Sequence, residues 1–414
     1  MDIVIVTNSP GEIAGWVMPV VKELVRRSTL DVRSDRIILF IPYCQYASGS
    51  EKEIASLIPG VDYVFGPQEH LKFLFFNKGI KGGFSKRGIL VHLGSDYFHS
   101  LLISRRLGYP AVAYTDNIDK FYDRYFRKFL VVDGNSRNRL AAKGISLEKI
   151  EVVGDLFADA AKPSLSREEA RKLWGFGLND FVVGVFPGSR PYQIKYMSPF
   201  FLQCAELIEK EIPQTKFILS KPVFISEEQV KNVIKNSNSS KVLEGTSGSL
   251  SDGWITTDKG AKIRLVSEMP YDVINSCDLI LTIPGTNTAQ IASLGCPMVV
   301  VVPLNKADEI PLDGIAGYMQ AFPFIGKPLK RFLVKSFSDK LKWTAIPNSK
   351  AMSEVVPEVR GVIHPREVAE KAIELITDKE KRTEMSGKLK EVMGNGGAAK
   401  KIAEIIQSLT GSSK

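Results

Sequence analysis

The chain has 414 residues, of which 44% are hydrophobic and 24% charged, a globular composition that argues against long disordered regions. The formal net charge of +9 favours phosphate, acidic lipid or nucleic acid as a partner, or else serves solubility alone. This length predicts two domains. Because the four cysteines are dispersed and no apolar run is long enough to span a bilayer, we expect a cytoplasmic protein, at most peripheral on a membrane.

Short β-branched runs alternate with helical patterns in the first half of the chain, which is typical of a parallel α/β sheet. The predicted strands are 2–7, 36–42, 88–94, 110–115, 128–133 and 149–155. The predicted helices are 14–27, 52–57, 99–107 and 136–143.

The second half repeats this alternation. Its predicted strands are 181–188, 216–221, 262–267, 277–283 and 297–303. Its predicted helices are 199–211, 227–235, 271–276 and 288–294, followed by a helical end over 365–409 that Gly394–Gly397 interrupts, while 237–253 is predicted to be a surface loop. We therefore predict two doubly wound, Rossmann-like α/β domains facing a cleft. The predicted domains are 1–160 and 161–380, and a C-terminal helical segment, 381–414, follows them.

Three turns at predicted strand ends carry the residues that could bind a ligand, because open α/β sheets bind ligands outside the carboxyl ends of their strands. The first turn, NSPGEIAG, contains Gly11 and Glu12. The second, PGSR, pairs Ser189 with Arg190, whose forked cation suits phosphate. The third, PGTNTAQ, offers N–H and hydroxyl donors at a helix start, where a pyrophosphate is favoured; its residues are Gly285, Thr286, Asn287, Thr288 and Gln290.

A fourth segment, VHLGSDYFHS, places Asp96 just past a strand of the first domain, where it could face the cleft as a general base. His92 in the same segment is in strand register and is equally suited to the core. Since no cluster has metal-ligand spacing, we predict no metal.

The stretch from residue 70 to 89 contains no acidic residue and interleaves phenylalanines with lysines. Such a surface suits insertion at an anionic bilayer, stacking on single-stranded nucleic acid, or a core helix with solvated lysines. For the membrane interpretation, the predicted contacts are Phe73, Phe75, Phe76, Lys78, Lys81 and Phe84.

Taken in order, these motifs resemble the lipid-A-disaccharide synthase family (glycosyltransferase family 19), which has a GT-B-like architecture. GEIAG resembles the family's GExSG, PGSR its PGSR turn and PGTNTAQ its SGTATLE-like turn. GDLFADA, CPMVV and IPN match further family motifs, so the resemblance covers nearly the whole chain.

The resemblance implies a metal-independent transfer of an acylated glucosamine from a UDP-linked donor to an acylated sugar phosphate, with no cofactor, at the inner face of the inner membrane. It places Arg190, Thr286 and Asn348 on the donor side and Glu12 on the acceptor side, where Glu12 is a candidate catalytic residue together with Asp96. It also supports the membrane interpretation of 70–89, in preference to nucleic acid, and a homodimer through the C-terminal segment.

The chain departs from the family pattern at Trp16, Gly94, Tyr97 and Gln290, where the family has an acidic residue. These departures are also consistent with a divergent paralogue that acts on another acceptor. Two alternatives also remain, a UDP-N-acetylglucosamine 2-epimerase-like isomerase and a catalytically inactive nucleotide- or lipid-binding relative.

Overall fold

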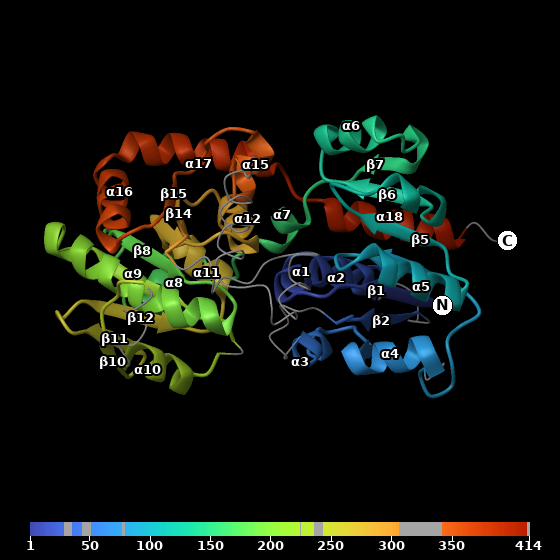
Figure 1. The fold of residues 1–414 in the computed structure, drawn as a ribbon, viewed down its shortest axis with the longest axis horizontal. Coiled ribbons are helices and arrows are strands. Elements are labelled where there is room, and N and C mark those ends of the chain that lie inside the picture. Colours follow the sequence, from blue (N-terminus) through green and yellow to red (C-terminus); the bar gives the residue numbers. More distant parts are fainter. Residues whose placement is uncertain are drawn as a thin grey trace, which may run out of the picture. The chain divides into compact units, whose positions relative to one another are not determined.

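The computed structural model describes residues 1–28, 35–43, 51–76, 79–223, 225–235, 243–305 and 342–411. The chain divides into two compact units, Met1–Ala160 together with the segment from Gly394 onward, and Ala161–Met393. Figure 1 shows the elements of both units. Each unit is built on one sheet.

The first unit contains a parallel sheet with the order β3-β2-β1-β4-β5-β6-β7. Its strands are β1 (Asp2–Val6), β2 (Arg36–Phe40), β3 (Tyr63–Phe65), β4 (Gly88–His92), β5 (Ala111–Tyr114), β6 (Lys128–Val131) and β7 (Ile150–Val152). Its helices are α1 (Pro10–Glu12), a π-helical turn (Ile13–Val17), α2 (Met18–Ser28), α3 (Glu51–Ser56), α4 (Pro67–Phe76), α5 (Tyr97–Leu107), η2 (Lys120–Tyr125), α6 (Gly134–Ala142), η3 (Leu147–Lys149), α7 (Leu156–Ala160) and α18 (Ala398–Gly411).

Both faces of this sheet are buried, because successive strand residues belong to two different cores. Ile3 and Ile5 pack with residues of α2 and α18, such as Val20 and Ile402. Their neighbours on β1 pack on the opposite face with residues of α4 and α5, including Phe73 and Ile103. The unit is therefore doubly wound, as predicted.

The second unit contains a mixed sheet with the order β10-β11-β12-β9-β8-β13-β14-β15, and among its described strands only the pairings of β11 are antiparallel. Its strands are β8 (Val182–Phe186), β9 (Lys216–Ser220), β10 (Gly248–Ser251), β11 (Trp254–Thr257), β12 (Lys262–Val266), β13 (Leu279–Thr282), β14 (Met298–Pro303) and β15 (Glu358–Gly361). Its helices are α8 (Arg167–Leu173), α9 (Pro191–Glu211), α10 (Glu227–Lys235), α11 (Pro270–Ser276), α12 (Thr286–Ser293), α15 (Ile346–Ala351), α16 (Pro365–Thr377) and α17 (Lys379–Met393).

The C-terminal helices differ from the predicted single segment 381–414. Helix α17 belongs to the second unit, whereas α18, red in Figure 1, packs into the core of the first. Asp159 fixes the start of α18 by accepting hydrogen bonds from Gly397 N at 2.6 Å and Ala399 N at 2.7 Å. The chain therefore returns to its first unit at its end.

Several element predictions were wrong in detail. β3, β11 and β15 were not predicted, and β10 lies inside the segment 237–253 that was predicted to be a loop. Helix α9 starts at Pro191, eight residues before the predicted start at Pro199. Proline favours the first helical position, and both prolines fit that rule, so the sequence signal was ambiguous.

Candidate functional site

In the second unit, the predicted turns PGSR and PGTN lie side by side. They follow β8 and β13, which are hydrogen-bonded neighbours. β8 comes first in this unit and the chain continues to β9 on its other side, so the strand order reverses between β8 and β13. Such a reversal point is where open α/β sheets bind their ligands.

The PGSR turn is held by a side chain that the sequence motif did not include. Gln193 Oε1 accepts hydrogen bonds from Ser189 N at 2.9 Å and Arg190 N at 3.0 Å. Both amides are therefore already bonded within the protein. Arg190 itself is half-buried, with its guanidinium 3.5 Å from the Tyr192 hydroxyl, and is the remaining candidate for anion binding in this turn.

Gly188 brings the two turns together. Its φ of +110° lies in the region that favours glycine. A Cβ atom at this position would lie 2.4 Å from Gln193 Oε1 and 2.7 Å from Ile283 Cδ1, in the turn that follows β13. A larger residue at 188 would therefore separate the turns.

The PGTN turn opens helix α12 with Gly285 as its N-cap, and Gly285 is exposed with a φ of +139°. The N–H groups of Thr286 and Asn287 belong to the first helical turn and have no intrahelical acceptor. Thr288 has a different role, because it is buried, donates its hydroxyl to Gly285 O at 2.8 Å and accepts from Ile346 N at 3.1 Å. The candidate anion-binding groups of this turn are thus the N–H groups of Thr286 and Asn287, whereas Thr288 stabilises the turn.

Gln290 lies one helical turn further along α12. Its Nε2 donates to the Tyr271 hydroxyl at 3.3 Å. Burial raises the pKa of Tyr271 to about 12, so this phenol stays protonated. Tyr271 was not predicted as a site residue, and no sequence motif marks it.

Asn348 does not have the donor-binding role that the resemblance implied. It is fully buried, and its Oδ1 accepts from Val355 N at 2.7 Å and Val356 N at 2.9 Å. Its Nδ2 donates to Val356 O at 2.8 Å and to Glu358 Oε1 at 2.9 Å. Since both ends of the amide are used internally, Asn348 is a structural residue that ties α15 to β15.

In the first unit, the turns after β1 and β4 meet at an equivalent reversal point, because β1 lies between β2 and β4. Gly11 and Glu12 form the short helix α1 after β1, where Ser9 and Glu12 make a reciprocal capping box. Glu12 Oε2 accepts from Thr7 Oγ1 at 3.3 Å and from Asn8 N at 3.2 Å. Burial raises the pKa of Glu12 above its ordinary value, and these hydrogen bonds only partly offset that effect.

Asp96 begins the neighbouring turn as the N-cap of α5. Its Oδ1 accepts from Phe98 N at 2.8 Å, and the side chain is exposed. Helix capping alone explains its presence. The exposed carboxylate is also compatible with proton transfer.

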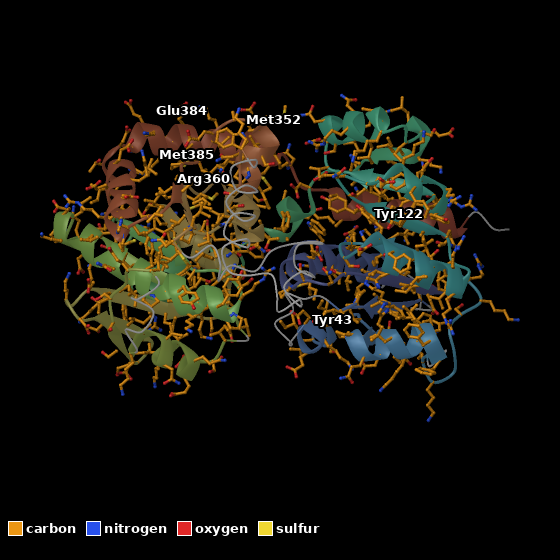
Figure 2. All side chains as sticks on the ribbon, viewed as in Figure 1. Tyr43, Tyr122, Met352, Arg360, Glu384 and Met385 are labelled. Carbon is orange, nitrogen blue, oxygen red and sulfur yellow. The ribbon has the colours of Figure 1, made fainter. Side chains whose placement is uncertain are left out.

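Two residues of the same segment form a buried polar network beside Asp96. The His92 ring is stacked on the Tyr97 ring, with 4.3 Å between centroids, and its Nδ1 lies 2.8 Å from Ser100 Oγ. The Tyr97 hydroxyl is hydrogen-bonded to Thr115 Oγ1, and burial raises the pKa of Tyr97 to about 12. Tyr122, from η2, lies 5.3 Å from Tyr97 between ring centroids and is labelled in Figure 2. His92 is thus a core residue.

The phenylalanines predicted to contact a membrane separate into two groups. Phe75 and Phe76, at the end of α4, are 74% and 72% exposed. Phe73 is 1% exposed and packs against Phe40 with 5.1 Å between centroids, so the prediction for this residue was wrong. Phe84 is half-buried and packs 5.3 Å from the Phe73 ring.

Of the two lysines predicted to contact the membrane, Lys81 is exposed. Lys78 lies outside the described residues. None of the helices in the described part of the chain combines the length and apolar character that a bilayer span requires. The described residues also bring together no group of three or more His, Cys, Asp or Glu side chains suited to a metal ion.

The chain is similar in sequence to lipid-A-disaccharide synthases, as its motifs suggested, although no family model matches it. It is 26% identical over 266 residues to the enzyme of Geobacter metallireducens and 27% identical over 269 residues to that of Geobacter sulfurreducens. Each match covers 63% of this chain and 58% of the relative, so the chain spans less than two thirds of the length of these relatives.

The fold is similar to that of UDP-GlcNAc 2-epimerases. The structure of the Neisseria meningitidis enzyme bound to UDP-GlcNAc matches 99% of this chain and 100% of its own, with a TM-score of 0.62 and 15% identity. The Staphylococcus aureus MnaA–UDP structure matches 99% of this chain and 96% of its own, with a TM-score of 0.59 and 14% identity. The fold is therefore of the GT-B type, with two Rossmann-like units.

Proposed function

We propose that the protein is a UDP-sugar-dependent hexosyltransferase that transfers an acylated glucosamine to an acylated sugar phosphate, as in lipid A biosynthesis. The observation that carries this proposal is that Arg190 and the exposed start of α12 lie on the turns that follow two neighbouring strands. These strands, β8 and β13, flank the reversal point of the sheet. A pyrophosphate in this position would be stabilised by a guanidinium and by two helix N–H groups. The sequence similarity to lipid-A-disaccharide synthases supports the same substrate class.

In this proposal the acceptor hydroxyl loses its proton to Asp96, while Arg190, Thr286 and Asn287 stabilise the charge that develops on the departing UDP. Asp96 is favoured over Glu12 as the base, because three donors of its own loop already bind one oxygen of Glu12. Glu12 would shape the acceptor loop.

We further propose that the protein acts as a peripheral protein on the inner face of the inner membrane. The support is the end of α4, where Phe75 and Phe76 are exposed beside the exposed Leu71 and Lys72. Apolar rings enter the interface between headgroups and acyl chains, and lysines attract anionic headgroups. Both lipid-linked substrates would be reached from that surface.

The test is incubation with a UDP-diacylglucosamine donor and a diacylglucosamine phosphate acceptor, followed by mass spectrometry. We expect a disaccharide product from the native protein and from the control Lys195→Ala. This control removes an exposed cation from α9, the helix of which Arg190 is the N-cap. We expect no product from Arg190→Ala at unchanged thermal stability. Full activity of Arg190→Ala would contradict the donor-site assignment.

Two alternatives predict other outcomes. The fold similarity supports a UDP-N-acetylglucosamine 2-epimerase as the first alternative. Such an enzyme would convert UDP-GlcNAc to its 2-epimer without an acceptor. An inactive relative, to which the amide at Gln290 points, would bind UDP in calorimetry and yield neither product.

A further inference from the structure

A pocket of the second unit lies at the edge of its sheet opposite the two turns. Asp278 and Pro297 line it and directly precede β13 and β14, whereas PGSR and PGTN follow the strands. Since these strands are parallel, the pocket is at their amino ends. Its volume of about 570 Å³ lies within the range of small-molecule sites, roughly 300–1,000 Å³.

The lining of this pocket has an excess of positive charge. Its cations are Arg167, Lys379, Arg382 and Lys390, against Asp278 as the only carboxylate among its lining residues. Asp278 is already bonded, because it pairs with Arg167, and its Oδ2 accepts from Arg171 at 2.7 Å and from Val182 N at 2.8 Å. The pocket therefore presents positive charge that Asp278 does not neutralise.

The two arginines are held rigidly by backbone carbonyls. Arg167 Nη1 donates to Asn275 O at 2.7 Å and to Cys277 O at 2.8 Å. Arg382 Nη1 donates to Ile376 O at 2.7 Å, and its guanidinium lies 4.8 Å from the centre of the Phe181 ring. Apart from the ion pair between Arg167 and Asp278, these contacts are made with uncharged groups, so they fix the guanidinium groups without adding a neutralising charge.

The lysines and hydroxyls come from one face of α17, because Lys379, Arg382, Thr383, Ser386 and Lys390 are spaced three or four residues apart. Lys379 and Lys390 are exposed, and no carboxylate of the described residues forms an ion pair with either. Lys390 extends across Gly295, where a Cβ atom would lie 2.4 Å from Lys390 Cε. The glycine thus makes room for the stem of this lysine at the pocket.

We propose that this pocket binds the phosphate or diphosphate group of a small soluble molecule. This binding is independent of the nucleotide crevice, which is the proposed UDP site at the PGSR and PGTN turns. Fixed guanidinium groups, adaptable ammonium groups and the Ser386 hydroxyl are the donors that phosphate oxygens require. A lipid-binding pocket would carry exposed apolar side chains at its rim, and none of the large exposed hydrophobic residues of the described chain lines it.

The experiment is isothermal titration with inorganic pyrophosphate in saturating UDP, which occupies the crevice, using the full chain. The test variant is Lys379→Ala/Lys390→Ala. The control, Lys381→Ala/Lys388→Ala, removes the same charge from α17 at lysines paired with Glu374 and Glu384, outside the pocket. All four lysines are exposed, so both variants should fold.

We expect at least a tenfold rise in Kd for the test variant and less than a twofold change for the control and for Arg190→Ala. Equal Kd values in the two lysine variants would overturn the proposal, as would loss of binding in Arg190→Ala. Binding to phosphatidic acid vesicles that depends on Lys379 and Lys390, without binding of free pyrophosphate, would also overturn it. Because Arg190 is the control for the crevice, failure of this proposal is separate from failure of the proposed transferase.

Discussion

The carboxyl group of Glu12 occupies the space beside Gly94 where any other residue would carry its side chain. A Cβ atom on Gly94 would lie 2.2 Å from both Cδ and Oε2 of Glu12. Gly94 also has a φ of +107°, which L-residues rarely adopt. The two turns at the reversal point of the first unit therefore depend on glycine at 94 and glutamate at 12 together.

We expect Gly94→Ala to lower the free energy of unfolding by about 2–4 kcal/mol, through backbone strain and displacement of Glu12. The matched control is Gly82→Ala, which costs backbone strain alone, because Gly82 has a φ of +89° and its Cβ would meet no atom within 4 Å. Chemical denaturation measures both. If the two variants lose the same stability, the contact between Glu12 and Gly94 has no energetic weight.

Asp96→Asn separates the capping role of this residue from its proposed role as a base. Asparagine caps helices as well as aspartate does, but its amide cannot accept a proton. We expect turnover to fall by about 10²-fold or more at unchanged stability. Asp133→Asn, at the cap of α6 in the same unit, is the control and should keep full activity. An active Asp96→Asn enzyme would remove Asp96 as the base.

Phe75 and Phe76 should anchor the protein to anionic vesicles. Removing two aromatic rings that would be buried in the bilayer interface costs about 3 kcal/mol or more of binding free energy, so we expect Phe75→Ser/Phe76→Ser to reduce vesicle partitioning by at least about tenfold. Leu173→Ser/Leu178→Ser removes two exposed leucines of the second unit and should not change it. Sedimentation with anionic vesicles measures partitioning, and equal partitioning of the two variants would contradict the proposed membrane surface.

A contact between the buried His70 and the half-buried His99 should make the first unit less stable in acid. His70 Nε2 lies 3.1 Å from His99 Nδ1, linking α4 to α5, and burial together with His99 lowers the pKa of His70 to about 4. The unfolded chain takes up a proton at His70 near pH 6.5, but the folded chain does so only near pH 4. Stability is therefore lost as the pH falls through this window, by up to about 1.4 kcal/mol per pH unit.

His70→Leu removes this titration, and its smaller pH dependence between pH 7 and 5 can be followed by hydrogen exchange in peptides from α4 and α5. His364→Gln, at an exposed position of the second unit, is the control and should behave as the native protein does. The same acid sensitivity in His70→Leu would show that other groups cause it. His92, whose pKa burial lowers to about 3, contributes equally to both proteins.

Much of the fold follows from local sequence patterns. Strands such as β1, β8 and β14 are runs of β-branched residues because the central strands of a doubly wound sheet are buried on both faces. The turns at their carboxyl ends could be located for the same reason, since polar and glycine residues interrupt an apolar run there. The sequence therefore determined the fold class and the position of the paired turns.

Only the tertiary structure decided which groups of those turns are available to a ligand. Gln193 occupies the amides of the PGSR turn, and Asn348 uses its whole amide within the protein, because hydrogen bonds join residues that no motif contains. Helix geometry likewise separated the phenylalanines of α4, because it places Phe73 in the core and Phe75 at the surface. The division of the last helices between two units had the same origin, because their apolar faces are complementary to different cores, and that complementarity exists only in the folded chain.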